Sequence, residues 1–178
     1  MNTYIALLRG INVSGQKKVP MDTLREVLFN LGFKEVKTYI QSGNVVFQSL
    51  ETNRDTLKQI IFDKLKSTFG FEVAVLIHSA NSLLKVLDQC PFQEEEMLGS
   101  YFTLLHDIPK EELIETISKE RYPDETFVIK EQCVYFYSKN GYGRAKCNNN
   151  FFERKLKVVA TTRNYKTMQK LIAMSFEK

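Results

Sequence analysis

Residues 4–8 read Tyr4-Ile5-Ala6-Leu7-Leu8, a continuous apolar run with the length of one strand. Such a run is typical of a strand that is covered on one face and flanked by neighbouring strands. Farther along, Pro20 stands where a first helical residue is expected, because the N–H that proline lacks would be unpaired there anyway. Apolar residues at helical spacing then predict a helix that ends at Gly32, with an inner face of Met21, Leu24, Val27, Leu28 and Leu31.

A hairpin, a second helix and a fourth strand are predicted to follow. Strands at 36–40 and 45–47 meet at Gln41-Ser42-Gly43-Asn44, a tight turn in which Gly43 can take a positive φ. Residues 53–69 predict a helix that Asn53 or Thr52 caps and Gly70 ends, and 71–77 predict a strand. The resulting order, β-α-β-β-α-β, is the ferredoxin-like arrangement.

Residues 100–157 repeat the order strand, helix, strand, strand, helix. Pro109 opens the first of these helices, a hairpin turns at Glu131-Gln132, and Asn150 with Glu153 has capping-box spacing for the second helix. Only Val158-Val159-Ala160 stands where a closing strand is due, so we expect the second copy to lack it and to end in a helix after Thr161-Thr162. In that last helix, the residues predicted to face inward are Met168, Leu171, Ile172 and Phe176.

The predicted fold is therefore α+β, with two tandem ferredoxin-like units, the second incomplete, and a C-terminal helix. The first unit is placed at 1–80 and the second, with the C-terminal helices, at 100–178. Residues 81–99 supply a bridging helix and a linker, of which Gln93-Glu94-Glu95-Glu96 is expected to be exposed.

The first copy carries ten residues that the second does without, Arg9-Gly10-Ile11-Asn12-Val13-Ser14-Gly15-Gln16-Lys17-Lys18. Packing does not require them, because the second copy makes the same connection in about two residues. A right-handed crossover makes the first two strands of a unit parallel. Their C-terminal ends then share one edge of the sheet, so this loop and the hairpin at 41–44 are expected to be neighbours. The second copy, conversely, is longer at 138–146.

The loop and hairpin offer hydrogen-bond donors and cations with almost no carboxylate. Gly10 and Gly15 let backbone N–H groups approach a ligand, and such loops before a helix N-terminus are suited to anions. We therefore expect a site for a small anionic ligand, bearing a phosphate or a carboxylate. Its candidate residues are Arg9, Asn12, Lys17, Lys18, Tyr39, Gln41, Ser42, Asn44, Thr162, Arg163 and Asn164. The alternative is that these polar groups serve their own turns and that Arg163 and Asn164 cap the last helix.

Catalysis has little support in the sequence. The GxxxxGK[ST] pattern is absent, and Ser42 has no general base placed beside it. Cys90, Cys133 and Cys147 lack metal-ligand spacing, and the carboxylates concentrate in 88–131, so we predict no metal and no cofactor. An enzyme acting on a small anion, with Ser42, Tyr39 or Lys18 handling protons, stays open as an alternative.

The net charge of +4 hides an asymmetry along the chain. Residues 79–138 hold 5 basic and 12 acidic side chains, whereas 139–178 hold 10 and 2. Either the basic block packs against the acidic one and the charges cancel, or it forms a surface for nucleic acid. Aromatic residues interleaved with the cations favour the second interpretation, namely Tyr142, Phe151, Phe152 and Tyr165. Against it, Phe151 and Phe152 are needed to dock their own helix.

No apolar run approaches the 18 residues that predict a membrane span, and the first residues lack the pattern of a signal peptide. The few, widely spaced cysteines are typical of reduced thiols. We therefore expect a cytoplasmic protein without a membrane partner. No pattern indicates an oligomeric state.

Three separated motifs resemble the bacterial family known as domain of unknown function 1697. They are Arg9–Val13 with Lys17–Met21, Thr38–Phe47, and Ala160–Asn164, and they occur in the family's order over nearly the whole chain. The resemblance implies a duplicated ferredoxin-like fold in a small cytosolic protein, and it implies no activity. One departure is Tyr165, where the family more often has Trp after Arg-Asn.

Overall fold

The computed structural model describes residues 1–13 and 15–177. The chain divides into two compact units, one formed by Met1–Leu84 together with the residues from Lys170 onward, the other by Lys85–Gln169. Each unit is built on one four-stranded sheet. No helix in the described ranges combines the length and the apolar character that a membrane span needs.

The first unit contains β1 (Asn2–Leu8), α1 (Met21–Phe29), β2 (Lys34–Tyr39), β3 (Asn44–Ser49), α2 (Arg54–Phe69) and β4 (Val75–His78). Its strand order is β2-β3-β1-β4, and all neighbouring strands are antiparallel. Since β3 lies between them, β1 and β2 run in the same direction, as predicted. Leu7 and Tyr39 both pair with Asn44, so the ends of β1 and β2 meet at one edge of the sheet.

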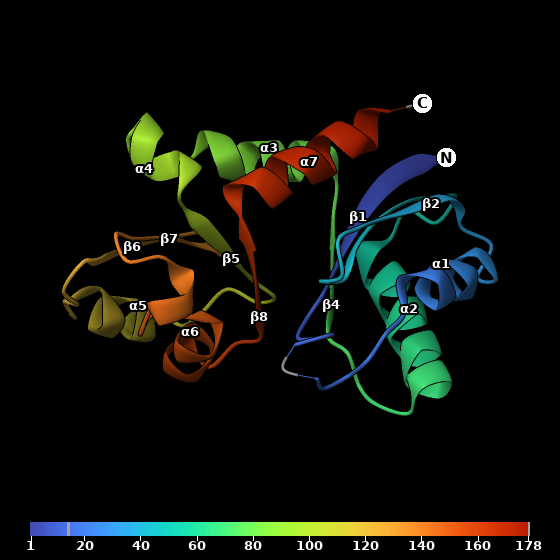
Figure 1. The fold of residues 1–178 in the computed structure, drawn as a ribbon, viewed down its shortest axis with the longest axis horizontal. Helices are drawn as coiled ribbons and strands as arrows, with labels where there is room; N and C mark the ends of the chain where they lie inside the picture. Colours follow the sequence, from blue (N-terminus) through green and yellow to red (C-terminus); the bar gives the residue numbers. More distant parts are fainter. Residues whose placement is uncertain (14, 178) are drawn as a thin grey trace. The chain divides into compact units, whose positions relative to one another are not determined.

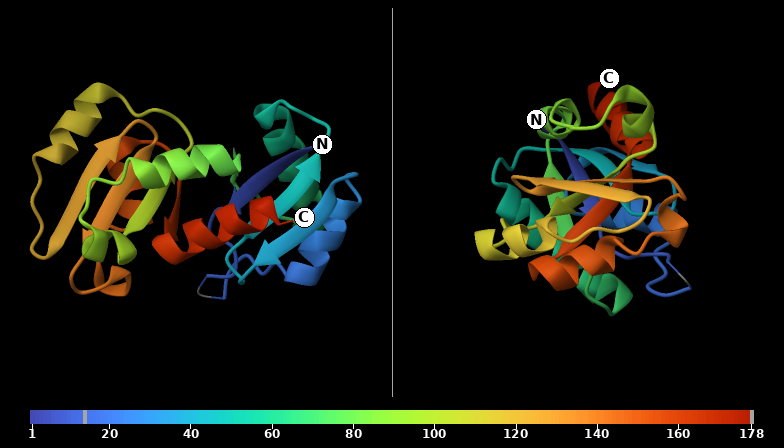
Figure 2. Two further views of the ribbon diagram at one scale, coloured as in Figure 1. Left: turned by 90° about the horizontal axis from the view of Figure 1, so that it is seen from above. Right: turned by 90° about the vertical axis from the view of Figure 1, so that its left-hand side faces the viewer.

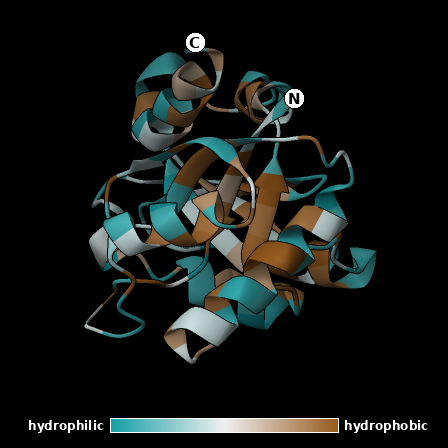
Figure 3. Ribbon diagram, turned by 90° about the vertical axis from the view of Figure 1, so that its right-hand side faces the viewer, coloured by the Kyte–Doolittle hydropathy of each residue, from teal (hydrophilic) through white to brown (hydrophobic). Residues whose placement is uncertain are grey.

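Helices α1 and α2 cover one face of this sheet (Figure 1). Hydrophobic and hydrophilic segments occur on both the strands and the helices (Figure 3). The core between them includes Ala6, Leu8, Leu24, Phe47, Leu57, Ile61 and Leu65, each at most 1% exposed. Asn53 caps α2 by accepting hydrogen bonds from the backbone N–H of Asp55 and Thr56, and Gly70 ends it at φ +78°. Both ends of this helix are as predicted.

The chain after β4 repeats the arrangement, and its first and last helices are each divided between the two units. After α3 (Ala80–Asp88) and α4 (Glu94–Leu98) come β5 (Tyr101–Leu105), α5 (Glu111–Ser118), β6 (Glu125–Lys130), β7 (Cys133–Ser138), a short 3-10 helix η1 (Tyr142–Arg144), α6 (Asn149–Leu156), β8 (Ala160–Asn164) and α7 (Tyr165–Phe176). The strand order, β6-β7-β5-β8, matches that of the first sheet. Helices α5 and α6 lie side by side on one face of the sheet (Figure 2).

The prediction that the second copy lacks its closing strand is wrong. β8 pairs antiparallel with β5 over five residues, from Tyr101 opposite Asn164 to Leu105 opposite Ala160. Sequence reasoning missed this strand because Thr161 and Thr162 are polar, although β-branched Thr favours strands. The buried Thr103 hydroxyl is satisfied across the strand pair, 2.8 Å from the Thr162 hydroxyl.

Smaller predictions also need correction. The helices expected to open at Pro20 and Pro109 begin at Met21 and Glu111. The fourth strand is Val75–His78 rather than 71–77, and the segment expected as an exposed linker forms the short helix α4 from Glu94. Asn148, not Asn150, caps α6, since its side chain accepts a hydrogen bond from the Phe151 N–H at 3.1 Å. Phe176 does not face inward, because it is 62% exposed at the end of α7.

The connection lengths differ less than the sequence indicated. The first unit uses residues 9–20 between β1 and α1, and the second uses residues 106–110 between β5 and α5. The first connection therefore has twelve residues and the second has five, whereas the sequence predicted about two for the second. Part of the long loop is core, because Ile11 and Val19 are each 1% exposed. Between these two anchors, the described residues of the loop are half-buried or exposed.

Candidate functional site

The loop at 9–20 alternates between buried anchors and an exposed tip. Ile11 and Val19 are buried, while Val13, Gly15 and Gln16 are exposed. The Gln16 N–H donates to the Val13 carbonyl at 3.0 Å, and the Asn12 N–H donates to the Lys17 carbonyl at 3.2 Å. The tip is therefore a small hairpin of its own that projects from the base of the loop.

Asn12 braces this loop with three side-chain hydrogen bonds. Its Oδ1 accepts from the Val19 N–H at 2.8 Å, and its Nδ2 donates to the Val19 carbonyl at 2.9 Å. The same Nδ2 donates to the Gln41 carbonyl at 2.8 Å. One amide thus ties the two sides of the loop together and binds them to the neighbouring hairpin. The expectation that loop and hairpin are neighbours is confirmed.

The hairpin turn, residues 40–43, packs tightly against the start of the loop. Gly43 has φ +73°, and a Cβ added there would lie 2.6 Å from the Leu8 Cβ and 3.0 Å from the Ile11 Cδ1. The Gly43 carbonyl accepts the Leu8 N–H at 2.8 Å. Glycine is therefore required at 43 twice over, for its backbone conformation and for the close approach.

Asn44 and Ser42 stabilise the turn from within. Asn44 is fully buried, and its Nδ2 donates to the Tyr39 carbonyl at 3.1 Å and to the Ser42 Oγ at 2.8 Å. This is the hydrogen bonding that the alternative interpretation of the hairpin predicts. Of the hairpin candidates, Tyr39 is half-buried and the Gln41 side chain is exposed.

The cations of the loop have different surroundings. Arg9 is half-buried, whereas Lys17 and Lys18 are exposed. The Lys17 Nζ donates to the Glu72 carbonyl at 2.7 Å, which holds that ammonium beside the loop. The Glu72 carboxylate pairs with the Lys66 Nζ at 2.9 Å, and this partner lowers the pKa of Glu72. Within the described part of the chain, Lys18 makes no ion pair.

Thr162, Arg163 and Asn164 belong to the second unit, where strand alternation sends neighbouring side chains to opposite faces. The Thr162 hydroxyl donates to the Asn149 Oδ1 at 2.8 Å, and Asn164 caps α7 by accepting the Thr167 N–H at 2.9 Å. Burial lowers the pKa of the Arg163 guanidinium to about 10, so it stays charged at neutral pH. That these three residues share a site with the first-unit loop stays a prediction.

A polar cluster in the second unit was missed by sequence reasoning. The Tyr142 hydroxyl accepts the Asn149 N–H at 2.8 Å, and its ring stacks on Tyr101 with centroids 4.4 Å apart. Burial raises the pKa of Tyr142. The spacing of Tyr142 and Asn149 around a loop gives no periodic signal, so only coordinates could reveal this contact.

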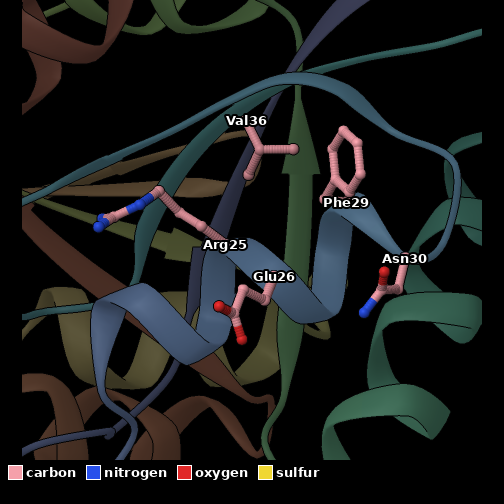
Figure 4. Close-up of a pocket in the computed structure, with 5 residues that line it drawn as sticks. All are labelled: Arg25, Glu26, Phe29, Asn30 and Val36. Carbon is pink, nitrogen blue, oxygen red and sulfur yellow. The ribbon is translucent and has the colours of Figure 1, made fainter.

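The first unit also has an open groove between α1 and β2, with a volume of about 410 Å³ (Figure 4). Phe29 and Val36 form its apolar part, and Glu26 and Asn30 add polar groups. The remaining lining residue, Arg25, pairs with Asp22 and donates to the Thr38 Oγ1 at 2.6 Å. The groove shares no residue with the loop and hairpin.

The surroundings of the thiols raise their pKa values and so favour the protonated form. Desolvation and the Glu125 carboxylate raise the pKa of Cys147 to about 12, and burial raises the pKa of Cys133. Among residues 1–13 and 15–177, no group of three or more His, Cys, Asp or Glu side chains could hold a metal ion. His78 Nδ1 lies 3.2 Å from the Ser82 Oγ, within a helix-capping turn.

Comparison with known proteins places the chain in a family. The conserved bacterial protein SP0830 from Streptococcus pneumoniae has a similar structure, with a TM-score of 0.76 and 25% sequence identity. The similarity covers 97% of this chain and 98% of that chain. No curated protein matches. The family model described as protein of unknown function (DUF1697) matches residues 1–135, and the chain therefore belongs to this family.

Proposed function

We propose that the first unit binds a small anionic ligand at the loop of residues 9–20 and the hairpin turn beside it. The observation that carries the proposal is the brace by Asn12, which fixes a cation-bearing loop through three hydrogen bonds. Residues 9–20 and 36–44 contain no Asp or Glu. A fixed set of donors without a competing carboxylate favours an anion.

The candidates divide into two groups by what their side chains already bind. Asn12 and Asn44 use their amides within the protein, so we assign them to holding the loop and the turn. Ligand contact then falls to the other first-unit candidates, above all to the exposed Lys18 and to Lys17, whose ammonium can donate more than the one bond it makes. Tyr39 and Gln41 belong to this group as well. Arg9 and Ser42 have partners within the protein, Ser42 through the Asn44 amide, and can contact a ligand only in addition to them.

The ligand class is a compact phosphate or carboxylate. Gly15 in the exposed tip allows close approach to the backbone, and Lys17 and Lys18 follow it with two positive charges. An ammonium hydrogen-bonded to an anion contributes about 1.5–3 kcal/mol, enough for roughly a tenfold change in affinity on its removal.

Isothermal titration calorimetry with inorganic phosphate, pyrophosphate and succinate tests this proposal. We expect at least one of the three to bind, and Lys18→Gln to weaken that binding about tenfold. Arg54→Gln is the matched control, because it removes one exposed positive charge from the same unit outside the loop. Binding that Lys18→Gln and Arg54→Gln reduce equally, or no heat with any of the three anions, would refute the proposal.

A further inference from the structure

The connection between β7 and α6 is the second unit's own long loop. It spans residues 139–148, whereas the first unit makes the same connection, between β3 and α2, with residues 50–53. Ten residues therefore stand where four suffice for packing. The extra length is a feature of this unit that the duplicated fold does not require.

This loop is held in place by a carboxylate beneath it. Glu125, on β6, accepts the N–H of Lys146 at 2.8 Å and the N–H of Cys147 at 2.9 Å. The Tyr142 hydroxyl receives the Asn149 N–H, which fixes the middle of the loop against the start of α6. The loop is thus a built part of the surface, with a defined backbone.

Its basic side chains are exposed and without acidic partners. Lys139, Arg144 and Lys146 on the loop, and Arg154 and Lys157 at the end of α6, are all exposed. None of these five forms an ion pair in the described part of the chain. Lys155 pairs with Glu120 of the acidic segment 79–138 at 2.5 Å.

The acidic segment therefore does not neutralise the basic one. Residues 139–157 carry six basic side chains and one acidic side chain. That acid, Glu153, accepts the Ala160 N–H at 2.8 Å. Beside the loop, the Glu125 carboxylate accepts hydrogen bonds from two backbone N–H groups. The Asp124 carboxylate accepts one from the side-chain Nδ2 of Asn140 at 3.3 Å. These acids hold the backbone while the lysine and arginine side chains face solvent.

The aromatic residues of the segment are not available for stacking on bases. Phe152 is fully buried and Phe151 is 6% exposed, both in the core of the second unit. The Tyr142 ring is already stacked on Tyr101. A ligand at this surface would therefore meet positive charge spread along a loop and a helix, with few stacking platforms, which suits a repeating anion better than a single phosphate.

We propose that the 139–148 loop, with the exposed cations of α6, binds nucleic acid through its phosphate backbone with little preference for sequence. Each cation that neutralises a phosphate adds to the salt dependence of the affinity. Because base stacking contributes little, single strands and duplexes of equal length are bound with similar affinity. This surface shares no residue with the loop of residues 9–20, and either proposal can fail without the other.

Fluorescence anisotropy with labelled single-stranded and duplex DNA of one length tests the inference, starting at about 25 mM salt, where phosphate contacts are least screened. We expect binding that weakens steeply as salt rises. The triple variant Lys139→Gln/Arg144→Gln/Lys146→Gln should lower the slope of log K against log salt by about 2–3, since each phosphate contact contributes about 0.7–0.9. The matched control, Lys110→Gln/Lys119→Gln/Arg121→Gln, removes three exposed charges around α5 and should retain the wild-type slope.

Circular dichroism and thermal melts of both triple variants establish that each is folded, and all substituted side chains are exposed. Absence of binding by the wild type in dilute salt overturns the proposal. Equal losses in the two triple variants also overturn it, because they would show a response to net charge alone. Tighter binding to vesicles of phosphatidylcholine and phosphatidylserine, lost in the loop variant, would assign the surface to membranes instead.

Discussion

Equivalent backbone hydrogen bonds are made at the end of the first strand of each unit, although the side chains there differ. In the first unit the N–H of Leu8, the last residue of β1, donates to the Gly43 carbonyl at 2.8 Å. In the second, the N–H of Leu105, the last residue of β5, donates to the Gln132 carbonyl, also at 2.8 Å. The residues that follow also match. The backbone N–H of Arg9 donates to the Ala74 carbonyl, and that of His106 donates to the Val159 carbonyl, both at 2.9 Å.

What differs is where each unit adds residues to this common frame. The first has four residues in its β2–β3 turn, 40–43, against two in the β6–β7 turn, 131–132, and a longer loop before α1. The second adds its residues before α6. Each unit forms the common fold without the other's additions, so the shared fold does not account for these segments. The second unit therefore serves as an internal control for the first.

The largest difference in stability between the two units is expected for a substitution at Gly43. Substitution Gly43→Ala places a Cβ 2.6 Å from the Leu8 Cβ in a backbone with φ +73°. We expect a loss of about 3 kcal/mol in the free energy of unfolding, from backbone strain and overpacking together. Urea denaturation measures this loss.

Gln132→Ala is the matched control, because Gln132 holds the corresponding position and already carries a Cβ. Its cost should stay within about 0.5 kcal/mol. If both variants were equally stable, the close approach of the turn to Leu8 would have no energetic importance.

The next largest effect is expected at Asn12. Asn12→Ala removes three hydrogen bonds and leaves the N–H and carbonyl of Val19 without their partner. The expected loss in the free energy of unfolding is about 2–3 kcal/mol. Hydrogen–deuterium exchange should also show faster exchange of the Val19 amide, since the Asn12 Oδ1 protects it.

Asn140→Ala gives the comparison within the second unit's long loop. Asn140 is exposed and makes one side-chain bond, to Asp124 at 3.3 Å, so its removal should cost less than about 0.5 kcal/mol. An Asn12 variant as stable as the Asn140 variant would mean that the brace does not hold the first loop, and the basis of the anion site would be lost.

Periodicity was enough to predict most of the elements and their order, because apolar spacing is a local property. It failed at β8, where Thr161 and Thr162 are buried or half-buried in spite of their polarity. The fitness of a threonine for a sheet depends on what lies across the strand, here the hydroxyl of Thr103. That partner is 59 residues away in sequence, so no local pattern contains it.

The candidate site was likewise predictable from the sequence only in part. Topology alone placed the loop and the hairpin together, and the bond from Asn12 to the Gln41 carbonyl confirms this. The different roles of Asn12 and Lys18 could not be separated in advance, because both read as polar loop residues. Only the partner of each side chain shows that one amide is committed within the protein and that one ammonium is exposed.

The smallest effect distinguishes the ion pairs of the two units. In the second, the hydrogen bonds from Lys155 and Tyr122 lower the pKa of Glu120. A carboxyl whose pKa is lower in the folded state stabilises the fold above the pKa of the unfolded state, and loses this contribution as the pH falls through the folded value. We expect Glu120→Gln to cost about 0.5 kcal/mol at pH 7 and less at pH 3, since protonation of the wild-type carboxyl removes this contribution as the pH falls.

The counterpart in the first unit is the pair of Lys66 and Glu72, whose side chains are 55% and 65% exposed, against 36% and 26% for Lys155 and Glu120. Water screens the more exposed pair, so Glu72→Gln should leave stability unchanged at both pH values although the pKa of Glu72 is also lowered. Urea denaturation of both variants at pH 7 and pH 3 decides the matter. A cost for Glu120→Gln that does not change with pH would assign the contribution to hydrogen-bond geometry, and the charge of Glu120 would then be immaterial to the second unit.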